Sequence, residues 1–569
     1  MRKFIPLLLL LISPLLWAAS PKPGSGHTHD GSIRPDMEEM GFYSSSDGVR
    51  RTSAMTKAAV STTGNKKILV ILADFGDFKF NKDYVVDDNG ANAKDSQVHD
   101  KAYYDDLLQG SYGLTMKKFY NQQSRGNLSL SFQVLGPYTA DNYFSYYGEN
   151  DDAENDKRPG TLAQEMMTKV KESGSAHADL DNCAVIIIHS GPGEEENKYK
   201  FSDFIWSHKS SLTQQNNKKY FPYEDNLSPV EIVPGKFFDN YIIVPEYTIW
   251  SAIGAPPPEE TVGVICHEFG HALGLKDAYD TTGATAGVGQ WSLMAGGEWG
   301  TMGTCGVAPG EDPTPFMAWE LAKLGWITER DITPAAGESK YYEFDNMNES
   351  SEVYRVNLSN DQHLTFEGMA KNLSGSGMAV YETGLLITQV HEGIIETYSS
   401  ANRINSTGYR PHGSMVVEAK ASNYKANGLG DLWRGSRNTY RVTTTALFRS
   451  DTLTSVGPVK ISEAELPVLP LFISTIIGSG MAISILLLWY YGRKKLCFAV
   501  ACAAFAACFS MSCSISGGGG GGGVYDSGPN TNYYTNMSNV HSKTGNSGIT
   551  IYNIKCNEDG SGSFCVKKE

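Results

Sequence analysis

The sequence has few cysteines for its length, and this scarcity limits the kinds of fold that it can encode. Nine cysteines occur in 569 residues, and only Cys183, Cys266 and Cys305 fall in the long central region. Three cysteines are too few to cross-link a region of this size, so a disulfide framework is excluded. An ordinary buried core must hold the central region, and the chain is long enough to form one.

Positive charge is also scarce. The chain carries 48 Lys and Arg against 63 Asp and Glu, which gives a formal net charge of −15. A surface that binds nucleic acid needs clustered Lys and Arg, so nucleic acid is not expected as the main partner. Hydrophobic residues make up 41% and charged residues 20% of the chain, which is typical of a globular protein. We find no internal repeat.

The N-terminal residues 1–20 have the layout of a secretory signal peptide. Arg2 and Lys3 precede an apolar run, and the small residues Ala18 and Ala19 follow it. A retained membrane anchor is the alternative, but the apolar run is short for a span. Residues 21–64 are rich in Ser, Thr, Gly and Lys and are interpreted as a linker or pro-segment. The mature protein is therefore expected outside the cytoplasm.

Two apolar segments follow a linker at 451–470. Residues 471–491 contain no charged residue and are long enough to span a bilayer, although a buried core helix is the alternative. The basic residues at 493–495 complete a predicted anchor over 471–495 and place the large domain outside the cytoplasm. A second apolar segment covers 496–516, and a Gly-rich and polar tail covers 517–569. A two-span hairpin, a lipid-attached tail and a fusion of two reading frames all remain open.

The region between the two termini is predicted to be α+β with a mixed sheet. Apolar runs at 66–75 and 183–191 indicate buried strands, and helical spacing appears near 114–122 and at 161–173. We assign 65–340 to one domain on this pattern. Several short strand-like runs follow, so residues 341–450 are expected to form a β-rich part that packs on it.

The segment VICHEFGHALGLKDAYD (264–280) carries the strongest functional signal. On a helix, His267 and His271 project in the same direction, at the separation that allows two imidazoles to bind one ion. The apolar residues of the segment fall on the opposite side of this helix. The alternative, a surface helix that holds two histidines by chance, does not explain the residues that follow.

A catalytic zinc ion takes three protein ligands and leaves one position open. Gly274 can end the helix in a left-handed conformation and turn the chain back, which brings Asp277 towards the two histidines as a third ligand. Asp280 is a weaker alternative. Glu268 lies between the histidines and suits a general base that accepts a proton from the attacking water.

These motifs resemble the M6 family of metalloproteases, the immune inhibitor A group. The resemblance is carried by HEFGHALGLKDAYD, WSLMAGG and PFMAWELAKLGWI (315–327), and it covers roughly residues 65–450. It implies a metzincin-like zinc peptidase domain with an active-site helix, in which a methionine turn at Met294 forms an apolar floor under the metal. Lys276 departs from the family pattern, in which proline usually precedes the aspartate.

The resemblance also implies protein or peptide substrates, and relatives often bind calcium. The acidic residues at 147–156, and Asp179 with Asp181, are candidate calcium ligands, with solvated surface acids as the alternative. Trp291, Glu298 and Trp299 are candidates for the lining of a cleft. The resulting hypothesis is an exported, membrane-anchored zinc endopeptidase. A catalytically silent surface binding or adhesion protein on the same scaffold is the rival, and nothing indicates the oligomeric state.

Overall fold

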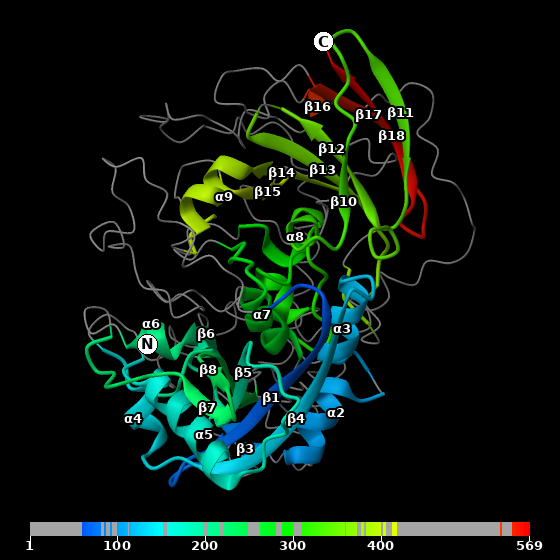
Figure 1. Cartoon of the computed structure of the whole chain (residues 1–569). Helices are drawn as coiled ribbons and strands as arrows, with labels where there is room; N and C mark the ends of the chain where they lie inside the picture. The colour runs from blue at the N-terminus through cyan, green and yellow to red at the C-terminus, as the bar shows by residue number, and fades with distance from the viewer. Residues whose placement is uncertain are drawn as a thin grey trace, which may run out of the picture. The chain divides into compact units, whose positions relative to one another are not determined.

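The computed structural model describes residues 60–417, 535–536 and 549–568, apart from 81–84, 87–91, 94–98, 112, 152–155, 197–202, 217–220, 248–261, 280–286, 301–309, 359, 373–376, 381–382, 400–401 and 406–411 (Figure 1). The predicted signal peptide, the linker at 451–470 and the apolar segments at 471–495 and 496–516 lie outside these residues. Within the described part, no helix has both the length and the apolar character needed to cross a membrane.

A mixed five-stranded sheet organises the N-terminal part. Its strands occur in the order β4 (Leu128–Thr139), β1 (Gly64–Asp74), β5 (Val185–Pro192), β9 (Asn240–Tyr247) and β6 (His208–Ser211). The first four strands are parallel, and β6 runs antiparallel to β9 at the edge. The predicted strands at 66–75 and 183–191 are therefore present as β1 and β5, side by side.

Both faces of this sheet are covered, which explains the continuous apolar runs in its central strands. Ile68, Val70 and Leu72 point into one core, which also contains apolar residues of α2 (Lys101–Gln109), α3 (Met116–Gln123) and α7 (Val262–Ala272). Leu69 and Ile71 point into the other, with residues of α4 (Phe144–Gly148) and α5 (Pro159–Ser173). The helices expected near 114–122 and at 161–173 are α3 and α5.

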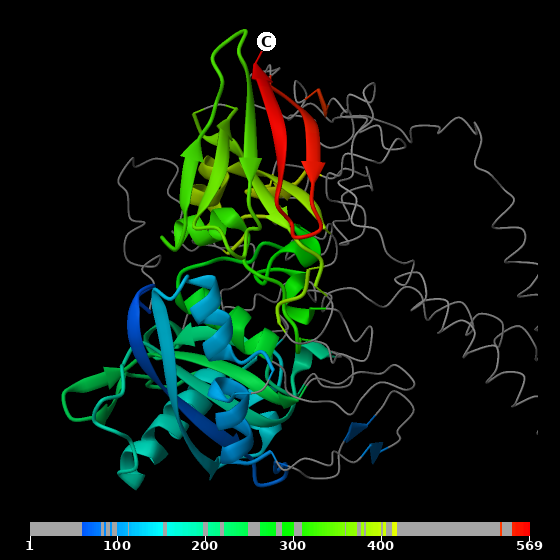
Figure 2. The ribbon, with the colours of Figure 1, turned by 90° about the vertical axis from the view of Figure 1, so that its right-hand side faces the viewer.

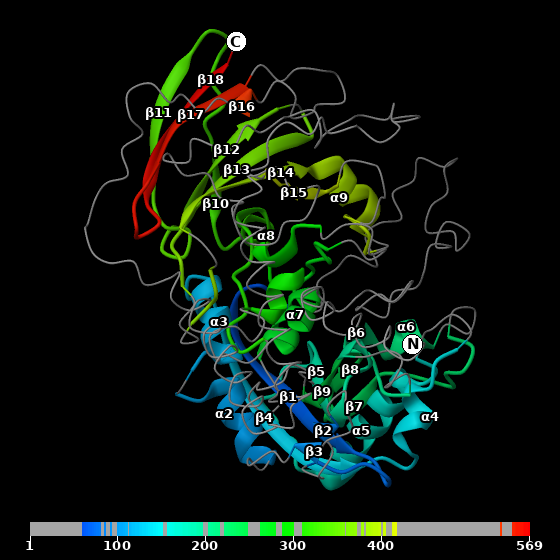
Figure 3. The ribbon, with the colours of Figure 1, turned by 180° about the vertical axis from the view of Figure 1, so that it is seen from behind.

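Shorter elements connect these parts. They are β2 (Val85–Val86), β3 (Asn92–Ala93), η3 (Glu194–Glu196), α6 (Leu212–Gln215), β7 (Val230–Val233), β8 (Lys236–Phe238), η4 (Gly289–Trp291), η5 (Gly296–Trp299) and α8 (Ala318–Lys323). Of these, η4, η5 and α8 follow α7 along the chain and share its apolar core. Figure 3 shows α8 next to α7.

The β-rich part consists of two sheets. One contains β10 (Thr328–Asp331), β12 (Glu352–Asn357), β13 (Gln362–Met369), β14 (Gly384–His391) and β15 (Ser414–Val416), and α9 (Glu392–Tyr398) follows β14. The other contains β11 (Ser339–Phe344), β18 (Gly562–Lys568), β17 (Ile549–Cys556) and β16 (Thr535–Asn536). A third apolar core lies between the two sheets.

The hairpin of β17 and β18 is a departure from the sequence analysis, which placed these residues in a polar tail. β18 pairs antiparallel with β11 (Figure 2). Phe564 is fully buried against Phe366, with ring centroids 4.7 Å apart. The alternation of apolar and polar residues in 549–568 is short and is separated from β11 by a long span of sequence, so it carries little information about its partner strand. The register places Cys565 opposite Tyr552 and Cys556 opposite Gly562, so the two cysteines do not face each other.

Candidate metal centre

Helix α7 is buried along its whole length, because the segment containing η4 and η5 packs directly on it. All of its residues from Val262 to Ala272 are buried. Two glycines allow the close approach: a Cβ at Gly263 would lie 2.0 Å from the Glu298 carbonyl oxygen, and one at Gly270 would lie 2.5 Å from Met294 Sδ. The histidine face of α7, expected to lie away from the core, therefore faces a buried polar site.

The chain reverses direction directly after α7. Gly274 has a φ of +100°, and its backbone N–H donates to the His271 carbonyl at 2.9 Å, which closes the end of the helix. The turn brings Asp277 back to the histidines. Asp280, the weaker alternative ligand, lies outside the described residues.

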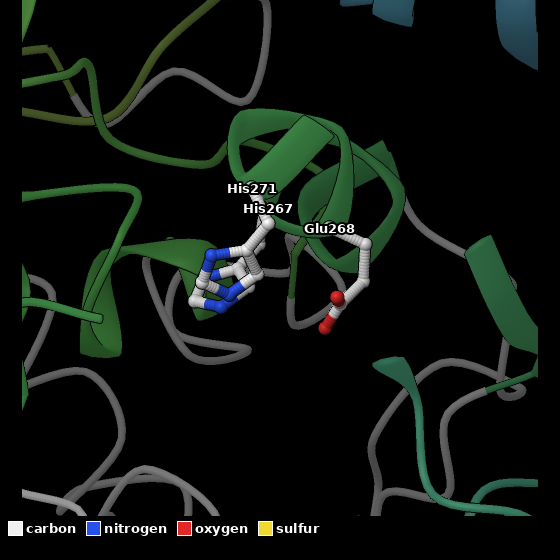
Figure 4. A group of neighbouring side chains, drawn as sticks. All are labelled: His267, Glu268 and His271. Atoms are coloured by element: carbon white, nitrogen blue, oxygen red, sulfur yellow. The ribbon is translucent and has the colours of Figure 1, made fainter. Parts of the chain in front are cut away.

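Three candidate ligand atoms converge after this turn. Nε2 of His267 lies 3.1 Å from Oδ1 of Asp277, and Nε2 of His271 lies 3.2 Å from the same oxygen. The Nδ1 atoms point the other way, towards the carbonyl of Leu293 at 2.8 Å and that of Leu275 at 3.1 Å. Figure 4 shows both imidazoles projecting from the same side of α7.

This donor set fits a divalent metal ion. A carbonyl oxygen can only accept a hydrogen bond, so each Nδ1 carries a proton, and each Nε2 faces Asp277 Oδ1, where it would bind a metal ion through its lone pair. Two imidazole nitrogens and one carboxylate oxygen are ligands that zinc accepts, with one coordination position left for water or substrate. The backbone carbonyls fix the orientation of the rings, as partners of metal-binding histidines commonly do.

The electrostatic environment of the site favours a positive charge at the same point. Burial lowers the pKa of His267, but the carboxylates of Glu298 and Asp277 outweigh it and raise that pKa to about 10. Burial raises the pKa of Asp277, but the two histidines outweigh it and hold that pKa well below its ordinary range. Glu298, whose Oε2 lies 3.3 Å from His267 Nδ1, was a candidate cleft residue in the sequence analysis and here contributes to this field.

Glu268 lies beside the two histidines and not between their ligand atoms. One oxygen of its carboxylate and one nitrogen of each histidine lie within 4.8 Å of one another, and all three side chains are buried. Its carboxylate projects from the next position on α7, beside the imidazoles (Figure 4). It can therefore exchange a proton with a molecule bound at the metal position without serving as a ligand.

Met294 is fixed below α7 by a hydrogen-bond network that the sequence analysis did not find. The Ser292 hydroxyl donates to Glu320 at 2.7 Å and accepts from the Met294 backbone N–H at 2.9 Å. Glu320 Oε2 also accepts from the backbone N–H of Met317 at the start of α8. Glu320 lies in the PFMAWELAKLGWI motif, so the signal was present, but spacing alone assigns it no role.

Neighbouring residues have structural positions. Burial raises the pKa of the Cys266 thiol well above its ordinary value, so this residue is a protonated core residue and not a thiolate ligand. Tyr120 of α3 donates to the Cys266 carbonyl at 2.6 Å and holds α7 against α3. Trp291 and Trp299 are both buried, at 2% and 8% exposure.

The candidate calcium ligands are only partly available. Lys67 Nζ lies 2.8 Å from Asp179 Oδ1 and neutralises it, and the Lys67 backbone N–H donates to Asp181 at 2.8 Å, so both carboxylates already have partners within the chain. In the 147–156 cluster, Asn150 donates to Glu194 at 2.7 Å, and residues 152–155 are outside the described part. Burial and the Glu194 carboxylate raise the pKa of Asp156.

Comparison with known proteins agrees with the geometry. A family profile for the immune inhibitor A peptidase M6 catalytic domain matches residues 54–327, which include α7 and the methionine turn. Residues 54–327 therefore match the M6 peptidase family and are called the M6 region from here on. The chain is 29% identical over 317 residues to the pre-pro-metalloprotease PrtV of Vibrio cholerae serotype O1, a match covering 48% of this chain and 32% of PrtV.

A second relative comes from another organism. Immune inhibitor A of Bacillus thuringiensis subsp. alesti is 28% identical over 305 residues, covering 47% of this chain and 41% of the relative. The chain thus matches well under half the length of each of these relatives. What the relatives do as whole proteins is therefore carried over to this chain only as a proposal.

Proposed function

We propose that the chain is an exported, membrane-anchored zinc endopeptidase that hydrolyses peptide bonds in proteins. The observation that carries the proposal is the approach of His267 Nε2 and His271 Nε2 to a single oxygen of Asp277, at 3.1 and 3.2 Å. The match of residues 54–327 to the M6 family, and the metalloprotease name of the PrtV relative, support the same reaction.

Residues of α7 and of the turn that follows it have different roles in the proposed reaction. A zinc ion bound by His267, His271 and Asp277 would polarise the scissile carbonyl and make a water molecule more acidic. Glu268 takes the proton from the attacking water at its carboxylate and returns it to the nitrogen of the leaving amine. Its burial keeps other water away from this carboxylate, and the Nδ1 hydrogen bonds to Leu293 and Leu275 keep both imidazoles oriented.

The test is to separate metal binding from proton transfer in the full chain. Glu268→Gln should retain one zinc per chain and lose about 10²–10⁴-fold in peptide hydrolysis, because it keeps the shape of Glu268 but cannot accept a proton. Glu172→Gln, an exposed position on α5, is the matched control. Full activity in Glu268→Gln would falsify the assigned role.

A catalytically silent binding protein on the same scaffold remains the rival function. It predicts that casein or gelatin zymography shows no lysis band for the wild-type chain, with or without a chelator. A peptidase predicts a band that the chelator removes and that added zinc restores. The buried Glu268 favours the peptidase, because a binding protein gains nothing from a desolvated carboxylate at this position.

The proposed membrane attachment has a topological consequence. β18 pairs with β11 along Ser339–Phe344, so the residues before and after the two apolar segments belong to one sheet. A single crossing would place these strands on opposite sides of the membrane. Their pairing supports an even number of crossings, with 471–491 and 496–516 as a hairpin, or a lipid-attached tail on the same side as the M6 region.

Reporter fusions after Glu569 test this topology. We expect alkaline phosphatase, which is active only outside the cytoplasm, to be active there, and a green fluorescent protein fusion exported through the same pathway to stay dark. Cytoplasmic fluorescence together with an inactive phosphatase would contradict the even-crossing arrangement.

A further inference from the structure

Asn402 is remote from the zinc motif in sequence, yet it contacts Asp277 at two points. Its Oδ1 accepts a hydrogen bond from the Asp277 backbone N–H at 2.9 Å, and its Nδ2 donates to Asp277 Oδ2. Both side chains are fully buried. We propose that Asn402 is a positioning residue for the metal centre. This inference rests on the proposed function, since it takes Asp277 as the third ligand.

The two oxygens of Asp277 have different partners. Oδ2 is held by Asn402, while Oδ1 faces Nε2 of both histidines. A carboxylate can rotate about its Cβ–Cγ bond and exchange its oxygens, and each exchange would change the distance from the ligand oxygen to the imidazoles. The amide of Asn402 opposes this rotation because it satisfies one oxygen and the backbone N–H together. It thereby selects Oδ1 as the ligand atom.

Asn402 follows α9 in the sequence and is held there by its own contacts. Its φ is +51°, a left-handed conformation that asparagine adopts more readily than most residues, and its backbone N–H donates to Ser399 at 3.2 Å. Ile404 in the same segment is fully buried in the core that contains α7. The amide of Asn402 therefore reaches Asp277 from a segment that is packed into this core.

A second asparagine strengthens the contact. Asn405 Nδ2 donates to the carbonyl of Ala278 at 2.5 Å, and Asn405 Oδ1 accepts from the Ser414 backbone N–H at 3.0 Å. The segment 402–405 thus forms hydrogen bonds with two consecutive residues, 277 and 278. It lies beyond residue 327, where the match to the M6 profile ends. The β-rich part therefore completes the metal site and is not an independent appendage.

The experiment compares three variants of the full chain. Asn402→Ala removes the amide, and Asn402→Asp keeps the shape but places a second carboxylate against Asp277 Oδ2. Asn226→Ala is the matched control, because Asn226 is exposed and has the same left-handed backbone, with a φ of +56°. Zinc Kd is measured by chelator competition, kcat and KM with a peptide substrate, and coordination by the absorption spectrum of the cobalt-substituted protein.

We expect Asn402→Ala to weaken zinc binding by about 10–100-fold, the range found for outer partners of metal ligands. Asn402→Asp should weaken it further, and Asn226→Ala should not change it. In the zinc-saturated Asn402→Ala variant, kcat should fall while KM stays the same, and the cobalt spectrum should shift. Should either variant fail to fold, Asn402→Gly accepts the same φ without strain and provides the same test.

Two failures are distinguishable. If the wild-type chain binds no zinc, the proposed function fails and this inference fails with it. If the wild-type chain binds zinc and Asp277→Ala does not, but the Asn402 variants keep the wild-type Kd and cobalt spectrum, only the positioning role is overturned. A lower melting temperature of the chelated Asn402 variants with an unchanged zinc Kd would likewise assign Asn402 to fold stability alone.

Discussion

The zinc motif and the β-rich part differ in how far apart in sequence their contacting residues lie. Within the motif, His267, His271 and Asp277 meet through one helix and one turn, so local spacing determines their geometry. In the β-rich part, β11 pairs with β18, and Asn402 reaches Asp277 from another element. The chemistry is thus encoded locally, while the support that holds it in place comes from distant segments.

The largest expected effect is the loss of zinc and of peptidase activity after a substitution in the zinc motif. His271→Ala removes one of the three converging ligand atoms, so the full chain should lose both its zinc and its peptidase activity. The melting temperature of the chelated protein should also fall, because in the absence of an ion the imidazole of His271 stabilises the buried carboxylate of Asp277. Metal analysis and calorimetry on the same sample check both statements. Retained zinc in this variant would show that the ligand set is wrong.

A substitution in the β-rich part should instead lower the stability of the chain and leave its zinc affinity nearly unchanged. Phe564 is fully buried and stacks on Phe366, so Phe564→Ala should destabilise the chain by about 3–5 kcal/mol. Zinc Kd per folded molecule should stay within a few-fold of the wild type. Denaturant unfolding measures the loss, and Lys567→Ala on the same strand, which is exposed, is the control. An unchanged unfolding midpoint would mean that the hairpin does not contribute to the fold.

These two regions also show how much the sequence could reveal. The strands β1 and β5 and the helices α3 and α5 follow from apolar runs and helical spacing. His267, Glu268 and His271 follow from their positions on one helix, and the structure brings Asp277 to the two histidines, although the role of each residue stays a prediction.

Asn402 and the hairpin of β17 and β18 could not be predicted in the same way. An asparagine in a loop has many possible partners, and only the three-dimensional path of the chain selects Asp277. Likewise, the short alternating pattern in 549–568 is compatible with any exposed sheet edge. Contacts of this kind form only when a long stretch of sequence closes into a loop. A local sequence pattern does not indicate which distant residues such a loop brings together.

A smaller effect is expected in the pH dependence of stability, through the buried carboxylate of Glu367. Burial raises the pKa of Glu367 on β13 to about 8, and this carboxylate accepts from the backbone N–H of Ala318 in α8. A raised folded-state pKa means that the folded chain holds a proton that the unfolded chain has lost. Stability should therefore fall as the pH rises from about 4.5 to about 8.

Glu367→Gln should remove this contribution. Relative to the wild type, the variant should gain on the order of 2 kcal/mol in unfolding free energy between pH 6 and pH 8. Denaturant titrations of both proteins at several pH values, with the exposed Glu349→Gln as control, measure the difference. Parallel pH profiles for wild type and Glu367→Gln would assign the pH dependence to other groups.

The smallest expected effect concerns Met294, whose backbone N–H donates to the Ser292 hydroxyl that in turn donates to Glu320. Its Sδ would lie 2.5 Å from a Cβ on Gly270, so the methionine side chain packs directly against α7. Met294→Leu conserves the volume of this side chain and should cost less than about 1.5 kcal/mol, with zinc Kd unchanged. Gly270→Ala at the same contact should cost more, because neither the helix nor the turn can move apart freely. If Met294→Leu instead changes zinc Kd by tenfold or more while stability is unaffected, the sulfur acts on the metal site itself and the turn belongs to the chemistry and not to its support.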